Sequence, residues 1–236
     1  MITLIGVGHV FAISENVKQI IRSRRPEVVC IELDPSRYYA LMQKDTQRKV
    51  PLQYLVLARI QKRIAGKFGT EIGDEMLAAA SAAGEIGAKL ALIDMDAQRI
   101  FAELWRKMSL KEKVGLFVGA FMGLFASKEK LEKEVDSYQE NDAMYIEKMG
   151  EEFPSVKEVL IDERNRFMAS KVTSLATTHG NIVVVIGDGH VPGMMEQLKA
   201  QQVEVIRLKE LRSGVNIPAS GSAQYSASFW YGPQNP

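Results

Sequence analysis

The chain has 236 residues, of which 46% are hydrophobic and 25% are charged. This is the composition of a soluble globular protein, and it excludes global disorder. With 30 basic and 29 acidic side chains the formal net charge is +1, which gives no electrostatic basis for binding duplex nucleic acid. The one cysteine, Cys30, excludes an internal disulfide framework and a cysteine-based zinc site.

The sequence lacks a secretory signal pattern, and its longest apolar run covers residues 114–126. That run is shorter than the roughly 20 residues that a bilayer span requires, so we expect a cytoplasmic, soluble chain. Lys113 and Lys128 bracket the run, which leaves two interpretations open. It is either a segment that dips into a membrane surface or a buried helix, including one at a homodimer interface.

In the first half of the chain, apolar runs alternate with helical patterns. Residues 2–5 predict a strand, and Ser14 is the expected N-cap of a helix over 15–24. A buried strand is expected at 28–31. The following ranges predict helices at 36–66 and 74–87 and a strand at 89–93.

The second half continues the alternation. It predicts a helical stretch over about 97–150, a helix over 155–175, a strand at 182–186, a helix over 193–200 and a last strand at 203–208. The segment 213–236 is rich in small residues and proline, and we expect a poorly ordered tail.

These elements predict one α/β domain over residues 1–212. Its central sheet should be mostly parallel and flanked by helices, with a helical insertion at about 97–150 between two strand–helix–strand halves. Ligands of such sheets bind beyond the carboxyl ends of the strands.

A five-residue pattern, Gly-x-Gly-His-Val, occurs twice, at residues 6–10 and 187–191. Each copy follows an apolar strand and precedes a helix, and together they hold two of the three histidines, His9 and His190. Glycines let the backbone turn sharply and approach a ligand closely, so Gly6, Gly8, Gly187 and Gly189 are candidate ligand-binding positions. Two imidazoles on neighbouring turns suit zinc, manganese, iron or cobalt.

Other interpretations of this repeat remain open. The histidines could simply hydrogen-bond nearby backbone at two tight turns. A dinucleotide fingerprint is disfavoured because Phe11 stands where its third glycine should be. The third histidine, His179, precedes Gly180 at an expected helix end, where we predict a C-terminal capping role.

Carboxylates follow the second and third predicted strands. Glu32 and Asp34 share one face of the chain after 28–31, and Asp94 and Asp96 repeat that spacing after 89–93. Burying Glu32 is costly unless a cation or hydrogen-bond donors pair with it, so it is our preferred third metal ligand. Asp34 and Asp94 are candidate substrate-binding residues, although each could instead cap a turn or helix.

Two arginines lie near the expected site. Arg37 follows the second strand and could bind a substrate carboxylate or pair with Glu32. Arg164 belongs to a charged run at 162–166, flanked by apolar residues, which is either a solvated helix face or turned partly inward.

The chain resembles the TraB/PrgY family, which is related to the TIKI proteases and more distantly to the ChaN and erythromycin-esterase proteins. The resemblance runs from about residue 2 to 210. It rests on G-V-G-H-V at 6–10, V-V-C-I-E-L-D-P-S-R-Y at 28–38, G-A-K-L-A-L-I-D-M-D at 87–96, L-I-D-E-R-N-R-F-M-A at 160–169 and G-D-G-H-V-P-G at 187–193.

The resemblance implies a TIKI-like α/β fold and a divalent-metal-dependent peptidase site, and we expect the metal to be manganese, cobalt or zinc. Its motifs correspond to His9, Glu32 and His190 as metal ligands, and further polar positions correspond to Arg37, Glu163 and Arg164. It also implies a link to shutdown of peptide signals. Many relatives carry membrane helices after this domain, whereas residues 213–236 contain none, so the sequence is either truncated or that of a soluble member.

Three functions follow from the sequence. The first is a metal-dependent peptide hydrolase with Glu163 as general base and Arg37 or Arg164 stabilising the oxyanion. The second is a non-catalytic protein that binds a peptide or small ligand. The third is a membrane-associated regulatory module that uses residues 114–126 or a segment beyond the sequence.

Overall fold

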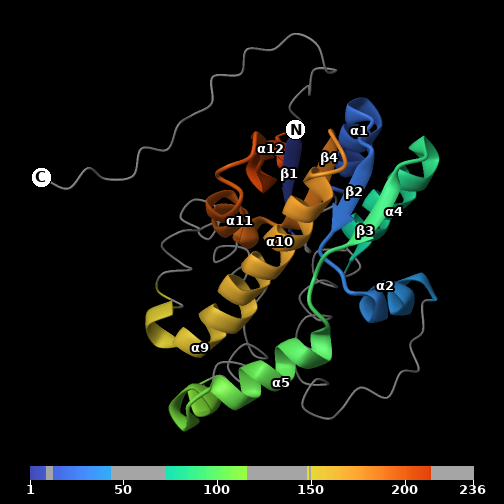
Figure 1. Cartoon of the computed structure of the whole chain (residues 1–236). Helices are drawn as coiled ribbons and strands as arrows, with labels where there is room; N and C mark the ends of the chain where they lie inside the picture. The colour runs from blue at the N-terminus through green and yellow to red at the C-terminus, as the bar shows by residue number, and fades with distance from the viewer. Residues whose placement is uncertain (9–12, 44–72, 116–147, 149, 214–236) are drawn as a thin grey trace, which may run out of the picture.

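The computed structural model describes residues 1–8, 13–43, 73–115, 148 and 150–213 (Figure 1). Five strands form one sheet: β1 (Ile2–Val7), β2 (Val28–Ile31), β3 (Lys89–Leu92), β4 (Ile182–Gly187) and β5 (Val203–Ile206). Their order is β3-β2-β4-β1-β5, and all four strand pairs are parallel. The predicted α/β fold with a parallel central sheet is therefore confirmed.

Buried β-branched residues explain why β1, β2 and β4 occupy the centre of the sheet. Every residue of β1 and β2, and all of β4 except Gly187, is buried, as expected for strands covered on both faces. The edge strand β3 starts with the exposed Lys89. The three central strands are those that lead into the predicted site.

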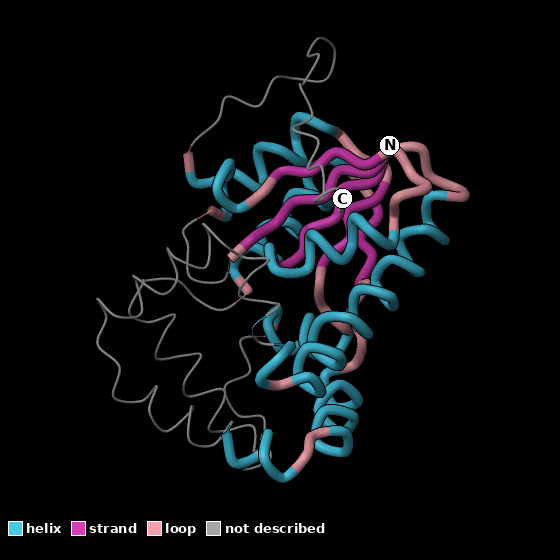
Figure 2. The backbone as a smooth tube through the Cα atoms, turned by 90° about the vertical axis from the view of Figure 1, so that its left-hand side faces the viewer, coloured by secondary structure: helices cyan, strands magenta, loops and turns pink. Residues whose placement is uncertain are grey.

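Helices cover both faces of the sheet, which lies between them as one layer (Figure 2). On one face pack α1 (Ser14–Arg24), α4 (Asp74–Ile86) and α12 (Leu208–Arg212). The other face is covered by α10 (Arg164–Ala176) and α11 (Val191–Gln197). In α1 the buried side chains Val17, Ile20 and Ile21 recur at helical spacing, so the apolar stripe of the sequence is the stripe that packs on the sheet.

Three further elements extend beyond the carboxyl ends of the strands. They are α2 (Pro35–Met42), α5 (Ala97–Lys107) and the helix pair that precedes α10. That pair consists of α9 (Pro154–Lys157) and the π-helix η1 (Glu158–Glu163), which continues directly into α10. A separate apolar cluster joins α5 to this pair through Ile100, Leu104 and Val159.

Two local predictions need correction, and one is confirmed. Ser14 is the first residue of α1, and Ile13 occupies the N-cap without a side-chain cap hydrogen bond. The helix expected over 155–175 begins at Pro154 and contains the π-helical segment. His179 does lie at the end of α10, where its backbone N–H and its ring Nδ1 lie 3.0 and 3.1 Å from the Leu175 carbonyl oxygen.

Several predicted segments fall outside the described residues. They are most of the helix at 36–66, most of the insertion at 97–150 including nearly all of the apolar run 114–126, and the tail after 213. Within the described ranges, every helix is too short or too polar to cross a bilayer.

Candidate functional site

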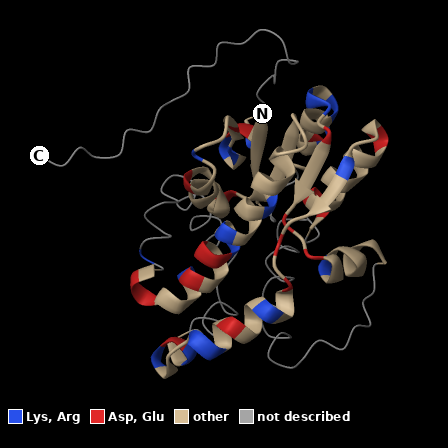
Figure 3. Cartoon of the chain, in the orientation of Figure 1, with Lys and Arg blue, Asp and Glu red and all other residues tan. Residues whose placement is uncertain are grey.

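The register of the central strands brings distant parts of the sequence to one edge of the sheet. Ile31 of β2 pairs with Val185 of β4, and the next residue, Glu32, donates its N–H to the Val185 carbonyl at 3.1 Å. On the other side of β4, Val7 of β1 pairs with Gly187. Figure 3 shows acidic residues in the loops that leave β2 and β3 at this edge.

Glu32 is a buried carboxylate with a donor on each oxygen. Its Oε1 accepts a hydrogen bond from Arg164 Nη2 and lies 3.3 Å from His190 Nε2, while its Oε2 accepts the Gly187 N–H at 2.6 Å. Burial alone would raise the pKa of Glu32, but the neighbouring His190 and Arg164 side chains and the Gly187 hydrogen bond outweigh burial. They hold the pKa well below its ordinary value, so Glu32 is an anion.

His190 approaches Glu32 from the second glycine–histidine motif. It ends the short 3₁₀ turn η2 (Asp188–His190) that links β4 to α11, and its side chain is buried. Ring atom Nε2 faces Glu32, and ring atom Nδ1 lies 2.8 Å from the side-chain oxygen of Asn165 on α10. The imidazole is thus held through Nδ1 by α10, and its Nε2 faces the Glu32 carboxylate.

Arg164 joins the carboxylates that follow β2 and β3. Besides Glu32 it binds Asp94, with Nε 3.0 Å from Oδ1 and Nη2 2.7 Å from Oδ2. The π-helical turn supports this position through two hydrogen bonds. The backbone N–H of Arg164 donates to the Ile161 carbonyl, and the Arg164 guanidinium donates to the Leu160 carbonyl at 3.1 Å. Desolvation would lower the pKa of Arg164, but the two carboxylates outweigh it and raise the pKa above its ordinary range.

Arg37 extends the same network toward solvent. Its Nη2 binds Asp94 Oδ2 and its Nε binds Asp34 Oδ2, both at 2.5 Å. Asp34 also accepts the Arg37 N–H and is the N-cap of α2, which is the alternative role that the sequence left open for it. The side chain of Arg37 is 35% exposed, whereas those of Asp34 and Asp94 are almost fully buried. We call Glu32, Asp34, Asp94, Arg37 and Arg164 the carboxylate–arginine cluster.

The glycines of the motifs have structural roles as well. A Cβ on Gly6 would lie 2.1 Å from Asp188 Oδ1, so only glycine lets this carboxylate lie against β1. Asp188 in turn binds Arg207 at 2.8 Å and accepts the N–H of Leu208, which ties the η2 turn to α12. Gly187 supplies the N–H that binds Glu32. Gly8 follows β1, and Gly189 lies within η2.

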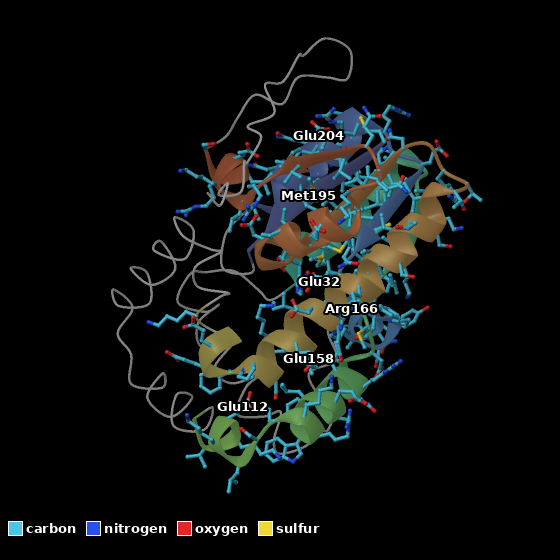
Figure 4. All side chains as sticks on the ribbon, turned by 60° about the vertical axis from the view of Figure 1, so that its left-hand side comes forward. Glu32, Glu112, Glu158, Arg166, Met195 and Glu204 are labelled. Atoms are coloured by element: carbon cyan, nitrogen blue, oxygen red, sulfur yellow. The ribbon has the colours of Figure 1, made fainter. Side chains whose placement is uncertain are left out.

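Glu163 forms an ion pair with Lys107 of α5, whereas its predicted role as general base requires a carboxylate that faces the reaction centre. Its Oε1 lies 2.6 Å from Lys107 Nζ, and the same ammonium also binds Glu158. Figure 4 shows Glu32 where the sheet meets α10, with Glu158 farther along toward α5. The described contacts therefore bring Arg164 and Arg37 into the site and pair Glu163 with α5.

The donor atoms of Glu32 and His190 fit part of a metal site. A carboxylate oxygen and an imidazole nitrogen 3.3 Å apart, with the ring held through its other nitrogen, are close enough to bind one divalent cation together. In the described part of the chain, no group of three His, Cys, Asp or Glu side chains could hold a metal. His9, the remaining predicted ligand, lies outside the described residues.

Asn165 and Gly193 are the site residues that the sequence did not single out. Asn165 belongs to the charged run at 162–166, but it is buried and contacts His190. A Cβ on Gly193 would lie 2.0 Å from Asn165 Nδ2. The available signal was that Ile161 and Ala169, one helical turn to either side of Asn165, are apolar.

Comparisons with known proteins agree with the family suggested by the motifs. An uncharacterized protein of Methanocaldococcus jannaschii is 33% identical over 238 residues, in an alignment that covers 91% of this chain and 59% of that protein. The chain thus spans less than two thirds of that relative's length. A structure of ChaN of Campylobacter jejuni, described as showing cofacial heme binding, aligns over 87% of this chain and 80% of that one, with 13% identity and a TM-score of 0.39. The TraB/PrgY/gumN family model matches residues 1–207, and the chain belongs to this family.

Proposed function

We propose that the chain is a divalent-metal-dependent hydrolase of peptides, with its reaction centre at Glu32 and His190. One observation carries the proposal. The two side chains come from neighbouring strands more than 150 positions apart in the sequence, and they meet at 3.3 Å in a buried position at the carboxyl edge of the sheet. Bringing these groups out of water is costly, and a bound cation would offset that cost.

In this proposal Glu32 and His190 hold the metal together with His9. When bound there, manganese, cobalt or zinc would supply Lewis acidity toward the scissile carbonyl and toward water. Asn165 orients the imidazole, and Gly187 orients the carboxylate of Glu32. Arg164 balances the charge of Glu32 and Asp94, so that the site is not dominated by uncompensated anions.

Arg37 is the residue that we assign to substrate binding. One edge of its guanidinium is held by Asp34 and Asp94, and its side chain is partly exposed. A guanidinium positioned in this way can bind a peptide carboxylate or a developing oxyanion. Glu163 could serve as general base only if its carboxylate leaves the ion pair with Lys107. Shutdown of a peptide signal is the physiological role that we attach to this activity.

One observation favours a second function, the binding of a peptide or small ligand without turnover. Both oxygens of Glu32 and both oxygens of Asp94 already accept hydrogen bonds from protein donors. Neither carboxylate is therefore free to take a proton from water while these contacts last. Mass spectrometry distinguishes the two functions, because a binder protects the intact peptide and yields no cleavage product.

The test is peptide cleavage by purified protein with added manganese, cobalt or zinc, with products identified by mass spectrometry. We expect cleavage that depends on metal, stops with a chelator, and falls below detection in His190→Ala and Glu32→Gln. His179→Ala is the matched histidine control, because His179 lies at the end of α10 against Leu175. Glu112→Gln is the matched control for a buried carboxylate, because Glu112 binds Ser109 and Ser155.

Cleavage that survives His190→Ala, or that no metal supports, would contradict the proposal. Equal losses in His179→Ala and His190→Ala would also contradict it, because the effect would then not depend on the site.

A further inference from the structure

The contact between Asn165 and His190 has a consequence for the proton on the imidazole ring. Asn165 is 3% exposed and His190 is 5% exposed, so water does not compete freely for either side chain. The side-chain oxygen of Asn165 lies 2.8 Å from Nδ1 of His190. An amide oxygen only accepts hydrogen bonds, so Nδ1 must be the donor and must carry a proton.

A proton on Nδ1 determines what the other nitrogen can do. In the neutral ring Nε2 then holds a lone pair, and Nε2 is the atom that faces Oε1 of Glu32 at 3.3 Å. Two acceptor atoms at this distance repel each other unless a cation or a second proton lies between them. The Asn165 contact therefore prepares Nε2 to bind a cation beside Glu32.

Two features of the chain adjoin Asn165. The π-helical segment η1 ends at Glu163, directly before Arg164 and Asn165. Consecutive residues on a helix point about 100° apart, so Arg164 binds Glu32 while Asn165 binds the neighbouring His190. The second feature is Gly193 of α11, where a Cβ would lie 2.0 Å from Asn165 Nδ2 and 3.0 Å from its Cγ.

We propose that Asn165 is a positioning residue that keeps a proton on Nδ1 of His190 and directs Nε2 toward the cation site beside Glu32, in space that Gly193 provides. The position of the proton on Nδ1 follows from the contact with Asn165 alone. The binding of a cation beside Nε2 and Glu32 rests on the proposed function. The two parts are tested separately, so that the failure of one is distinguishable from failure of the other.

The first experiment locates the ring protons by long-range proton–nitrogen NMR on metal-free protein, at an alkaline pH where imidazoles are neutral. We expect His190 to carry its proton on Nδ1 in the wild type and in Asn165→Asp, which keeps an acceptor. In Asn165→Leu we expect the proton to move to Nε2, where it can donate to Glu32. Gly193→Ala should have the same effect, because the added Cβ displaces Asn165.

The signals of His179 serve as the internal control and should be the same in all four proteins. A wild-type His190 with Nδ1 unprotonated would overturn the proposal, and so would an Asn165→Leu variant whose ring protons match the wild type. Thermal melting of each variant confirms that it is folded. If Asn165→Leu does not fold, the wild-type spectrum and the Asn165→Asp and Gly193→Ala variants still decide the question.

The second experiment measures affinity for manganese, cobalt and zinc by calorimetry. Residues that orient a ligating histidine typically contribute 10- to 100-fold, so we expect Asn165→Leu to weaken binding by about that factor. Equal affinity in the wild type and Asn165→Leu would overturn the positioning role. A wild type that binds none of the three metals would refute the proposed function, while the NMR result would still decide the proton assignment.

Discussion

The two ends of the parallel sheet differ in how far their paired carboxylates are exposed to solvent. At the carboxyl edge, Arg164 holds Glu32 and Asp94, and all three side chains are at most 12% exposed. At the amino edge, Arg24 binds Glu204 at 2.6 Å; the arginine is 9% exposed, and the Glu204 side chain is 28% exposed. The carboxylates at the carboxyl edge are therefore desolvated, whereas water can reach the carboxylate at the amino edge.

This difference shows where the fold carries an electrostatic cost that folding alone does not require. Buried ion pairs contribute little net stability, because desolvation offsets their attraction. An α/β sheet can end in partly hydrated pairs, as the amino edge does here. The desolvated network at the carboxyl edge is therefore best explained by a function at that edge.

The largest difference between the two edges should appear when one arginine is removed from each. Arg164→Leu leaves two carboxylates buried without their partner, and we expect it to lower the free energy of unfolding by about 3–5 kcal/mol. Arg24→Leu leaves Glu204 able to take up water, and a loss of about 1 kcal/mol is expected. Urea denaturation followed by circular dichroism measures both values. Equal losses would remove the distinction between the edges.

A pair of glycine substitutions tests the packing at each end. Gly6→Ala places a Cβ against Asp188 at the carboxyl edge, and we expect it to cost about 1–3 kcal/mol. Gly84→Ala lies in α4, which leads into the start of β3, and its Cβ would meet nothing within 4 Å. It should stabilise the protein by about 0.5–1 kcal/mol, because alanine favours the helix. Melting temperatures that shift in the same direction would contradict this account.

Acid unfolding tests the charge on Glu32. Its pKa is lowered in the folded protein relative to the ordinary value of 4.5, so the unfolded chain binds the proton more tightly. The stabilising contribution of Glu32 is therefore complete above about pH 4.5 and is lost as the pH falls toward the folded-state pKa. Glu32→Gln should make stability less dependent on pH in this acid range. Denaturant titrations at a series of pH values measure the slope, and an unchanged slope would contradict the prediction.

Cys30, in the centre of β2 between the two edges, gives the smallest expected effect. Burial raises the pKa of its thiol to about 12, so the thiolate that reacts with alkylating reagents is scarce at neutral pH. Native protein should remain unlabelled by iodoacetamide, and protein in denaturant should be labelled fully. Fast labelling of the native chain, read by mass spectrometry, would show that the centre of the sheet opens readily.

The strands and the position of the site could be predicted because both follow from short patterns. Apolar β-branched runs identify β1, β2 and β4, and parallel pairing brings their carboxyl ends together. Glu32 and His190 each lie just beyond one of these runs, so their convergence follows from the order of the strands. The helix α12 was missed because five residues are too few to show helical periodicity.

The helix side of the site could not be predicted in the same way. The run 162–166 resembles a solvated helix face, and its composition does not show that Arg164 and Asn165 point toward the sheet. The π-helical segment changes the register just before these residues, and no local sequence signal identifies such a segment. The pairing of Glu163 with Lys107 depends on how α5 packs, which spacing along the sequence does not reveal.

The most direct test of the account is elemental analysis of the purified protein after dialysis against manganese, cobalt or zinc. We predict near-stoichiometric metal in the wild type, His179→Ala and Glu112→Gln, and almost none in His190→Ala and Glu32→Gln. Absence of metal from the wild type, or equal metal in His190→Ala, would contradict the claim that these two side chains form a metal site.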